Sequence, residues 1–121
     1  MGFGMSGESL RLSVHVYIEV DSLPDALEQA GKLCRLLGEI GFSMECHVER
    51  YWKIPTYYSI TLPLTVSDAA TSVEQAKRLL GERWATSRTE ELLSAVWDYR
   101  LHGNFALPLA RWCELQLDHG G

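Results

Sequence analysis

Residues 10–20, LRLSVHVYIEV, decide the fold of this chain. Apolar and polar side chains alternate over the whole stretch, and most of the apolar ones are β-branched. A period of two with this composition predicts a β-strand that buries one face and leaves the other exposed. The side chains expected on the exposed face are those of Arg11, Ser13, His15, Tyr17 and Glu19.

The chain then changes to a helical period over residues 21–41. Asp21 or Ser22 can accept hydrogen bonds from the first free N–H groups, and Pro24 suits the first turn of a helix. Apolar side chains, Cys34 among them, form one stripe along this helix. Gly38 or Gly41 is expected to end it in a left-handed turn.

Two further strands follow, over residues 42–49 and 57–64, and a short connection predicts that they form an antiparallel hairpin. Pro63 has no N–H to donate to a sheet, so we expect it at the end of its strand. Arg50 continues the buried series of the first of these strands, which predicts a bulge near Glu49 and Arg50 or a hairpin that runs past the helices. The inward series of that strand comprises Phe42, Met44, Cys46 and Val48.

A second helix is predicted over roughly residues 69–85, with Trp84 on its apolar stripe. The sequence SRTE at 87–90 is typical of a capping box, in which Ser87 and Glu90 would open a third helix that ends near Gly103. A strand over 94–101 is the competing prediction, because AVWDYRL is rich in residues that favour strands. Residues 111–118 alternate again and predict the last strand.

The expected order is β-α-β-β-α-(α)-β in a single α+β domain that spans residues 1–121. Residues 1–8 are expected to be a flexible lead or a cloning remnant. Helices bury one stripe and strands one face, so the simplest arrangement is an antiparallel sheet with its helices on one side. This order resembles the ferredoxin-like split β-α-β arrangement, with an extra helix before the last strand. The resemblance implies a four-stranded sheet and no particular chemistry.

Composition narrows the functional classes. A net charge of -5 argues against nucleic acid as the partner, because phosphate binding calls for clustered Lys and Arg. No apolar run approaches the roughly 20 residues of a membrane helix, and no signal peptide opens the chain, so we expect a cytoplasmic protein without a membrane partner. Cys34, Cys46 and Cys113 show no metal-binding spacing and are expected to be buried free thiols in a reducing compartment.

The uncovered face of the predicted sheet and the aromatic hairpin tip are the candidate binding surface. Tyr51 and Trp52 are expected either to fold back over the helix ends or to project from the tip and bind. Exposed Tyr, Trp and His are frequent anchors of protein interfaces, although a merely solvated face is equally consistent with the pattern. The candidate partner-binding residues are Tyr51, Trp52, Tyr57, His15, Tyr17, His47, Glu45, Glu49, Trp112 and Glu114.

No catalytic residue, metal or cofactor is predicted. His15 and His47 would stand two strand spacings apart, roughly 9–10 Å, and lack a convergent third ligand. Tyr17 and Tyr57 resemble the stacking residues of RNA-recognition sheets, but the glutamates expected on the same face would repel phosphates. We therefore expect a non-enzymatic interaction protein, most concretely an immunity or antitoxin-type inhibitor of a basic toxin. The alternatives are a homodimeric α+β domain or enzyme that encloses a small molecule against the open sheet face, and a subunit that scaffolds a larger assembly.

Overall fold

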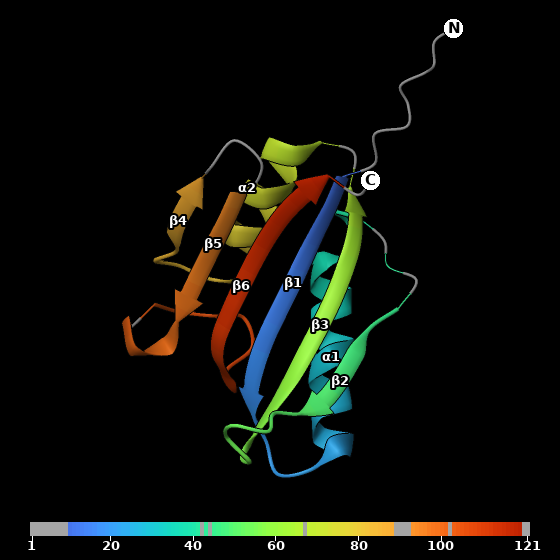
Figure 1. The fold of residues 1–121 in the computed structure, drawn as a ribbon, viewed down its shortest axis with the longest axis vertical. Coiled ribbons are helices and arrows are strands. Elements are labelled where there is room, and N and C mark those ends of the chain that lie inside the picture. Colours follow the sequence, from blue (N-terminus) through green and yellow to red (C-terminus); the bar gives the residue numbers. More distant parts are fainter. Residues whose placement is uncertain are drawn as a thin grey trace, which may run out of the picture.

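The computed structural model describes residues 10–41, 43, 45–66, 68–88, 93–101 and 103–119. The expected lead, and Phe42, Met44 and Glu90 of the expected elements, fall outside these ranges. Within them the chain forms an open antiparallel sheet of six strands, in the order β2-β3-β1-β6-β5-β4. Figure 1 shows the sheet from its uncovered side, with both α-helices behind it.

Three long strands form the middle of the sheet, and each has the alternating pattern that predicted it. They are β1 (Leu10–Glu19), β3 (Tyr57–Val66) and β6 (Ala110–His119), and β1 pairs with both of the others along its length. Short strands β2 (His47–Arg50) and β4 (Ala85–Arg88) form the two edges. Strand β5 (Leu93–Asp98) lies between β4 and β6, and a short 3-10 helix, η2 (Tyr99–Leu101), follows it.

Each α-helix begins at a side-chain cap. Helix α1 (Leu23–Leu37) begins after Ser22, whose hydroxyl accepts a hydrogen bond from the backbone N–H of Asp25. Helix α2 (Ala69–Leu80) begins after Asp68, whose carboxylate accepts one from the N–H of Thr71 at 2.9 Å. Such caps satisfy N–H groups that have no partner inside the helix, which fixes where each helix starts.

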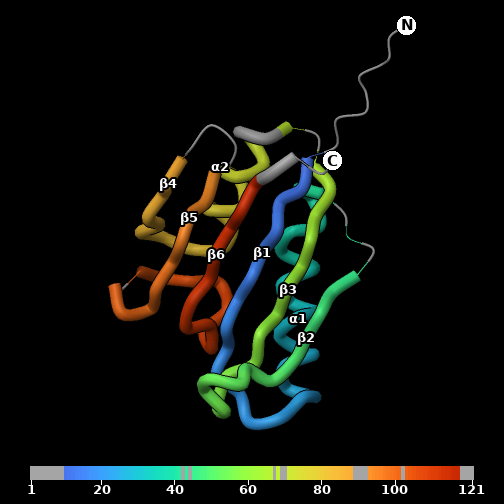
Figure 2. Tube along the Cα trace, viewed as in Figure 1, coloured from blue at the N-terminus to red at the C-terminus, as the bar shows by residue number. Residues whose placement is uncertain are grey.

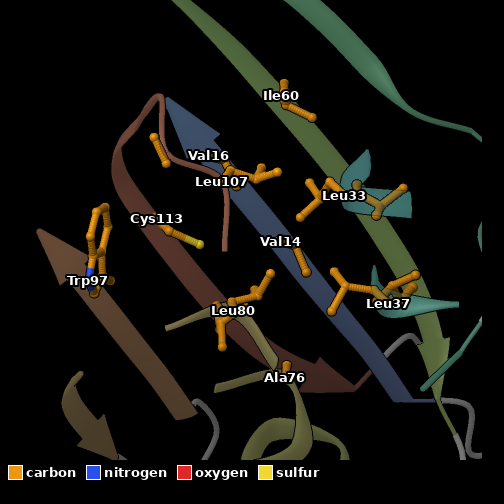
Figure 3. Packing of buried hydrophobic residues seen from close by; sticks show 14 of the residues in the cluster. Val14, Val16, Leu33, Leu37, Ile60, Ala76, Leu80, Trp97, Leu107 and Cys113 are labelled. Carbon is orange, nitrogen blue, oxygen red and sulfur yellow. The ribbon is translucent and has the colours of Figure 1, made fainter. Parts of the chain in front are cut away.

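The core lies between the helices and the covered face of the sheet. Leu33 and Leu37 of α1 and Leu80 of α2 belong to one buried cluster with Val14 and Ile60 of the central strands (Figure 3). All five side chains are buried. Because period-two strands and one-stripe helices each have a single apolar side, this packing leaves the other side of the sheet free of helices.

The expected four-stranded ferredoxin-like topology is wrong. The expected third helix over 87–101 is instead the hairpin of β4 and β5, which extends the sheet beyond β6. Ala95 and Trp97 are buried while Ser94 and Val96 are only partly so, a period of two that the competing strand prediction had anticipated. Pairing with β5 satisfies the backbone groups of β6 that would otherwise form an exposed edge. Ser87, the expected cap, lies in β4.

Helix α2 is also shorter than expected, because Trp84 belongs to its end and not to its stripe. The Trp84 indole N–H donates to the carbonyl oxygens of Lys77 and Gly81, at 3.1 and 3.0 Å, where the last turn of a helix lacks partners. Gly81 is extended and forms a β-bridge with Phe105. A Cβ at Gly81 would lie 2.6 Å from the backbone oxygen of Asn104, so only glycine permits this approach.

Smaller expectations also need correction. Gly38 follows the last turn of α1 with a right-handed helical φ of -63°, so it does not end the helix in a left-handed turn. The strand expected over 42–49 is observed only over His47–Arg50, and no register shift interrupts it at Glu49 or Arg50. Pro63 lies inside β3, but beyond the last residue that pairs with β2, so its missing N–H faces no neighbouring strand on that side. Cys34 and Cys46 are exposed, and only Cys113 is buried as expected.

A membrane span was not expected, and among the described residues no helix combines the length and apolar character needed to cross a bilayer.

Candidate functional site

Three aromatic rings form a stacked row on the uncovered face of the sheet. Tyr17 of β1 lies opposite Trp112 of β6, and their ring centroids are 5.1 Å apart with planes inclined by 29°. Tyr51 follows β2 directly and stacks on the other side of Tyr17, at 4.4 Å and 25°. We call Tyr51, Tyr17 and Trp112 the aromatic row. Stacking of this kind contributes beyond the burial of area, so the row is a built feature of the fold.

The connection between β2 and β3 holds Tyr51 in this position. The backbone N–H of Tyr51 donates to the oxygen of Tyr57, and that of Tyr57 donates to the oxygen of Ile54. The Arg50 guanidinium adds hydrogen bonds to the oxygen of Pro55 at 2.7 Å and to the Tyr58 hydroxyl at 2.8 Å. Figure 2 shows this connection beside the lower end of β1. Tyr51 therefore takes neither expected course, because it folds back over the open face of the sheet.

Trp52 behaves differently from its neighbour. Its side chain is 79% exposed, and its ring contacts only the rim of the row, 6.4 Å from Tyr51. The Lys53 ammonium lies 5.2 Å from the centre of the indole ring. An indole exposed to this extent contributes little to the core and is available to a partner.

His15 lies beneath the row in the middle of the sheet. Its Nε2 atom is 2.8 Å from the hydroxyl of Ser59, and its ring meets Tyr17 and Trp112 edge-on at 4.8 and 5.8 Å. Burial lowers the pKa of His15, while the carboxylate of Glu114 on β6 opposes that shift. The imidazole is therefore neutral at pH 7. Burial also raises the pKa of Tyr17 to about 12, and a hydrogen bond with Tyr51 adds to it.

A bulge in β6 places a cation beside the row. The register with β1 shifts between Tyr17 and Ile18, which leaves Arg111 as an extra residue. Arg111 reaches the open face, where its Nε donates to Glu19 at 2.9 Å and its guanidinium carbon lies 5.4 Å from the centre of the Tyr99 ring. The bulge thus adds a neutralised ion pair to a surface that the sequence predicted to be acidic.

A pocket of about 260 Å³ opens between the row and η2. Burial raises the pKa of Tyr57 on its wall, and the adjacent Tyr99 and Glu19 add to that shift. Asp98 and Arg100 form an ion pair at 2.6 Å on its rim. Together the residues lining this end pocket are Tyr17, Tyr51, Ile54, Tyr57, Asp98, Tyr99, Arg100, Arg111 and Trp112.

The structure brings together seven of the ten residues predicted for the site. His15, Tyr17, Tyr51, Tyr57 and Trp112 lie in or beside the row and the end pocket, with Trp52 at its rim and Glu114 opposite His15. The remaining three residues belong to the β2 edge, where exposed His47 and Glu45 face each other at 3.5 Å and Glu49 lies opposite Ser59, the partner of Tyr17 on β1.

Five residues of the site were not predicted, namely Ile54, Asp98, Tyr99, Arg100 and Arg111. Tyr99 and Arg100 were expected in a helix. The competing strand prediction for this segment would have placed them at the end of a strand, beside the sheet. Ile54 belongs to the tip segment that was considered only through its Tyr and Trp residues. No pattern in the sequence predicts the bulge that brings Arg111 to this face.

One pair of side chains on this surface resembles part of a catalytic arrangement. A serine hydroxyl within hydrogen-bonding reach of a neutral histidine is the starting arrangement of a nucleophile and its base. Ser59, however, is only 9% exposed, which limits the access of a substrate to its oxygen. In the part of the chain that the structure describes, no three His, Cys, Asp or Glu side chains are grouped to hold a metal ion.

No family model, characterised protein or solved structure matches this chain.

Proposed function

We propose that this chain is a non-enzymatic interaction protein that binds a protein partner with the aromatic row, the end pocket and Trp52. The observation that carries the proposal is the preformed stack of Tyr51, Tyr17 and Trp112, next to an indole that is 79% exposed. Interfaces concentrate their binding energy in Tyr, Trp and Arg, and all three types gather here. Rings that are already packed lose little side-chain entropy on binding.

The size of the end pocket supports a protein partner over a small molecule. Its volume of about 260 Å³ falls below the range of roughly 300–1,000 Å³ that ligand sites occupy. A single anchoring side chain from a partner fits such a volume. Exposed apolar residues continue around it, since Ile54 and Tyr99 line the pocket and Leu109 lies at the same end of β1.

The most concrete form of the proposal is an immunity or antitoxin-type inhibitor of a basic toxin in the cytoplasm. Support comes from the net charge of -5 and from the glutamates that flank the row. Arg111 neutralises Glu19 and Arg100 neutralises Asp98, whereas Glu49 and Glu114 have no ion-pair partner among the described residues. A basic partner surface would meet those two carboxylates beside the aromatic anchors.

Matched variants test the proposal. Trp52→Ala combined with Tyr99→Ala removes exposed aromatic contacts, while Leu27→Ala combined with Leu79→Ala removes exposed apolar contacts from the two helices. A partner captured by the wild type and purified should bind the helix variant normally and the aromatic variant at least tenfold more weakly in calorimetry. Equal binding to both variants would contradict the proposed surface.

A homodimeric small-molecule domain is the second candidate, because a second copy could close the half-open pocket. The specific observation in its favour is that Tyr17 and Tyr57 both line that pocket. Light scattering separates the two candidates. A dimer that dissociates in the aromatic variant favours enclosure of a small molecule, and a monomer in both variants favours the protein partner.

A further inference from the structure

Two exposed thiols lie on facing elements at the β2 edge of the molecule. Helix α1 packs against β2 and β3 behind the sheet (Figure 1). Val48 of β2 pairs with buried Ile60 and is itself half-buried against the core, so its side chain points toward the helix layer. Cys46 precedes Val48 by two residues and, in an extended chain, shares that direction.

The other thiol approaches from the helix. Cys34 follows buried Ala30 by one helical turn, which places it on the flank of α1 next to the buried stripe. Both cysteines are free and exposed. Partial burial raises the pKa of Cys46, and Cys34 lies near enough to add to that shift.

We propose that Cys34 and Cys46 form a reversible disulfide by exchange with a low-molecular-weight disulfide such as oxidised glutathione. The thiolate of Cys34 attacks one glutathione sulfur, forms a mixed disulfide and releases one glutathione thiolate. Cys46 then loses its proton and attacks the Cys34 sulfur, which expels the second glutathione thiolate. Two protein thiols are oxidised, and one glutathione disulfide is reduced to two thiols. The proposal does not depend on the proposed function.

The order of the two steps follows from the surroundings of the thiols. Burial raises the pKa of Cys46 to about 11, and the Cys34 thiol adds to this shift. Little Cys46 thiolate exists near neutral pH, so the second step limits the rate and accelerates as the pH rises. Cys113 is fully buried in the core, where burial raises its pKa well above the usual value, and it takes no part.

The disulfide would tie helix α1 to the segment that leads into β2. Closing a loop of this short length restricts the unfolded chain, and the melting temperature should rise by on the order of 10 °C. Strand β2 leads directly to Tyr51, so the bond would restrain the strand that delivers one ring of the aromatic row.

Intact mass and peptide mapping after incubation of the folded chain in glutathione buffers of graded ratio test the proposal. The wild type should lose about two hydrogens in mass, yield a Cys34–Cys46 linked peptide and melt at a higher temperature. Cys46→Ser should stop at a glutathione adduct on Cys34, and Cys34→Ser should form no internal bond. Glutathione adducts on both thiols of the wild type, or a covalent dimer through Cys34, would overturn the inference.

Discussion

Tyr51 and Trp52 are adjacent aromatic residues whose removal should have different effects on stability. Tyr51 is half-buried and stacks on Tyr17 with a centroid distance of 4.4 Å, whereas Trp52 is 79% exposed. A buried aromatic side chain contributes roughly 1.5–3 kcal/mol through its area, of which Tyr51 would gain about half. A stacked pair adds about 0.5–1.5 kcal/mol. Tyr51→Ala should therefore lower the free energy of unfolding by about 1.3–3 kcal/mol.

Trp52→Ala should cost no more than about 0.5 kcal/mol, the usual limit for surface substitutions. For a chain of this size the two values correspond to losses in melting temperature of roughly 5–10 °C and less than about 2 °C. Urea denaturation followed by circular dichroism measures both changes in the free energy of unfolding. Tyr51→Phe is the matched control, because it keeps the stacked ring and removes only the hydroxyl.

A second measurement on the same variants examines the row directly. The pKa of Tyr17, raised to about 12 in the native protein, should fall toward 10.0 in Tyr51→Ala, since the variant exposes the Tyr17 ring and removes its hydrogen bond. Absorbance of tyrosinate against pH follows this change. If Tyr51→Ala proved no more costly than Trp52→Ala and left the Tyr17 titration unchanged, the stack would not exist in solution.

Two further predictions concern the backbone and His15. Gly81→Ala should destabilise the fold by about 2 kcal/mol or more, because its Cβ would lie 2.6 Å from the oxygen of Asn104. Gly31→Ala inside α1, where a Cβ would meet only the Arg35 guanidinium at 3.7 Å, should stabilise the fold by about 0.5–1 kcal/mol. Thermal melts of both variants compare the two sites. Burial lowers the pKa of His15 below 6.5, so the unfolded chain binds a proton at a higher pH than the folded chain does. The free energy of unfolding should therefore be highest above pH 6.5 and should fall as the pH drops toward the folded pKa. Denaturation between pH 5 and 8 measures this slope, which should be smaller in His15→Gln.

Local patterns predicted the parts of the fold that depend on nearby residues. The alternation of residues 10–20 predicted β1, and a cap followed by a proline predicted the start of α1 at Leu23. The same alternation predicted an uncovered face with His15 and Tyr17 on it, and in the structure both side chains are partly exposed while the alternate residues of β1 are buried. These features follow from period and capping chemistry, which act over a few residues.

The segment over 87–101 shows where local reasoning fails. Its apolar residues fit a helix or a strand, and the capping-box pattern favoured a helix. The outcome depended on β6, whose free edge was completed by pairing with β5 and whose pairing buries Ala95 and Trp97. A long-range partner of this kind overrides local propensity, and a single sequence does not display it.

The aromatic row depends on long-range contacts in the same way. In the sequence, Arg50 interrupts a series of buried apolar residues. In the structure its hydrogen bonds to Pro55 and Tyr58 stabilise the connection that places Tyr51 over the sheet. The prediction that Cys34 and Cys46 are buried was wrong for a related reason. Alternation gave Cys46 the correct side, but a short edge strand does not extend far enough to bury it.

The position of the row constrains how folding and binding can be separated in this protein. Tyr17 and Tyr51 stack on each other, so substitution of either ring changes stability and surface together. Trp52 and Tyr99 lie at the rim and are largely exposed, so their loss should leave the fold intact. A partner that engages this end of the sheet is therefore best detected through Trp52 and Tyr99. Any weakening seen with Tyr17 or Tyr51 variants would combine a lost contact with a loosened row.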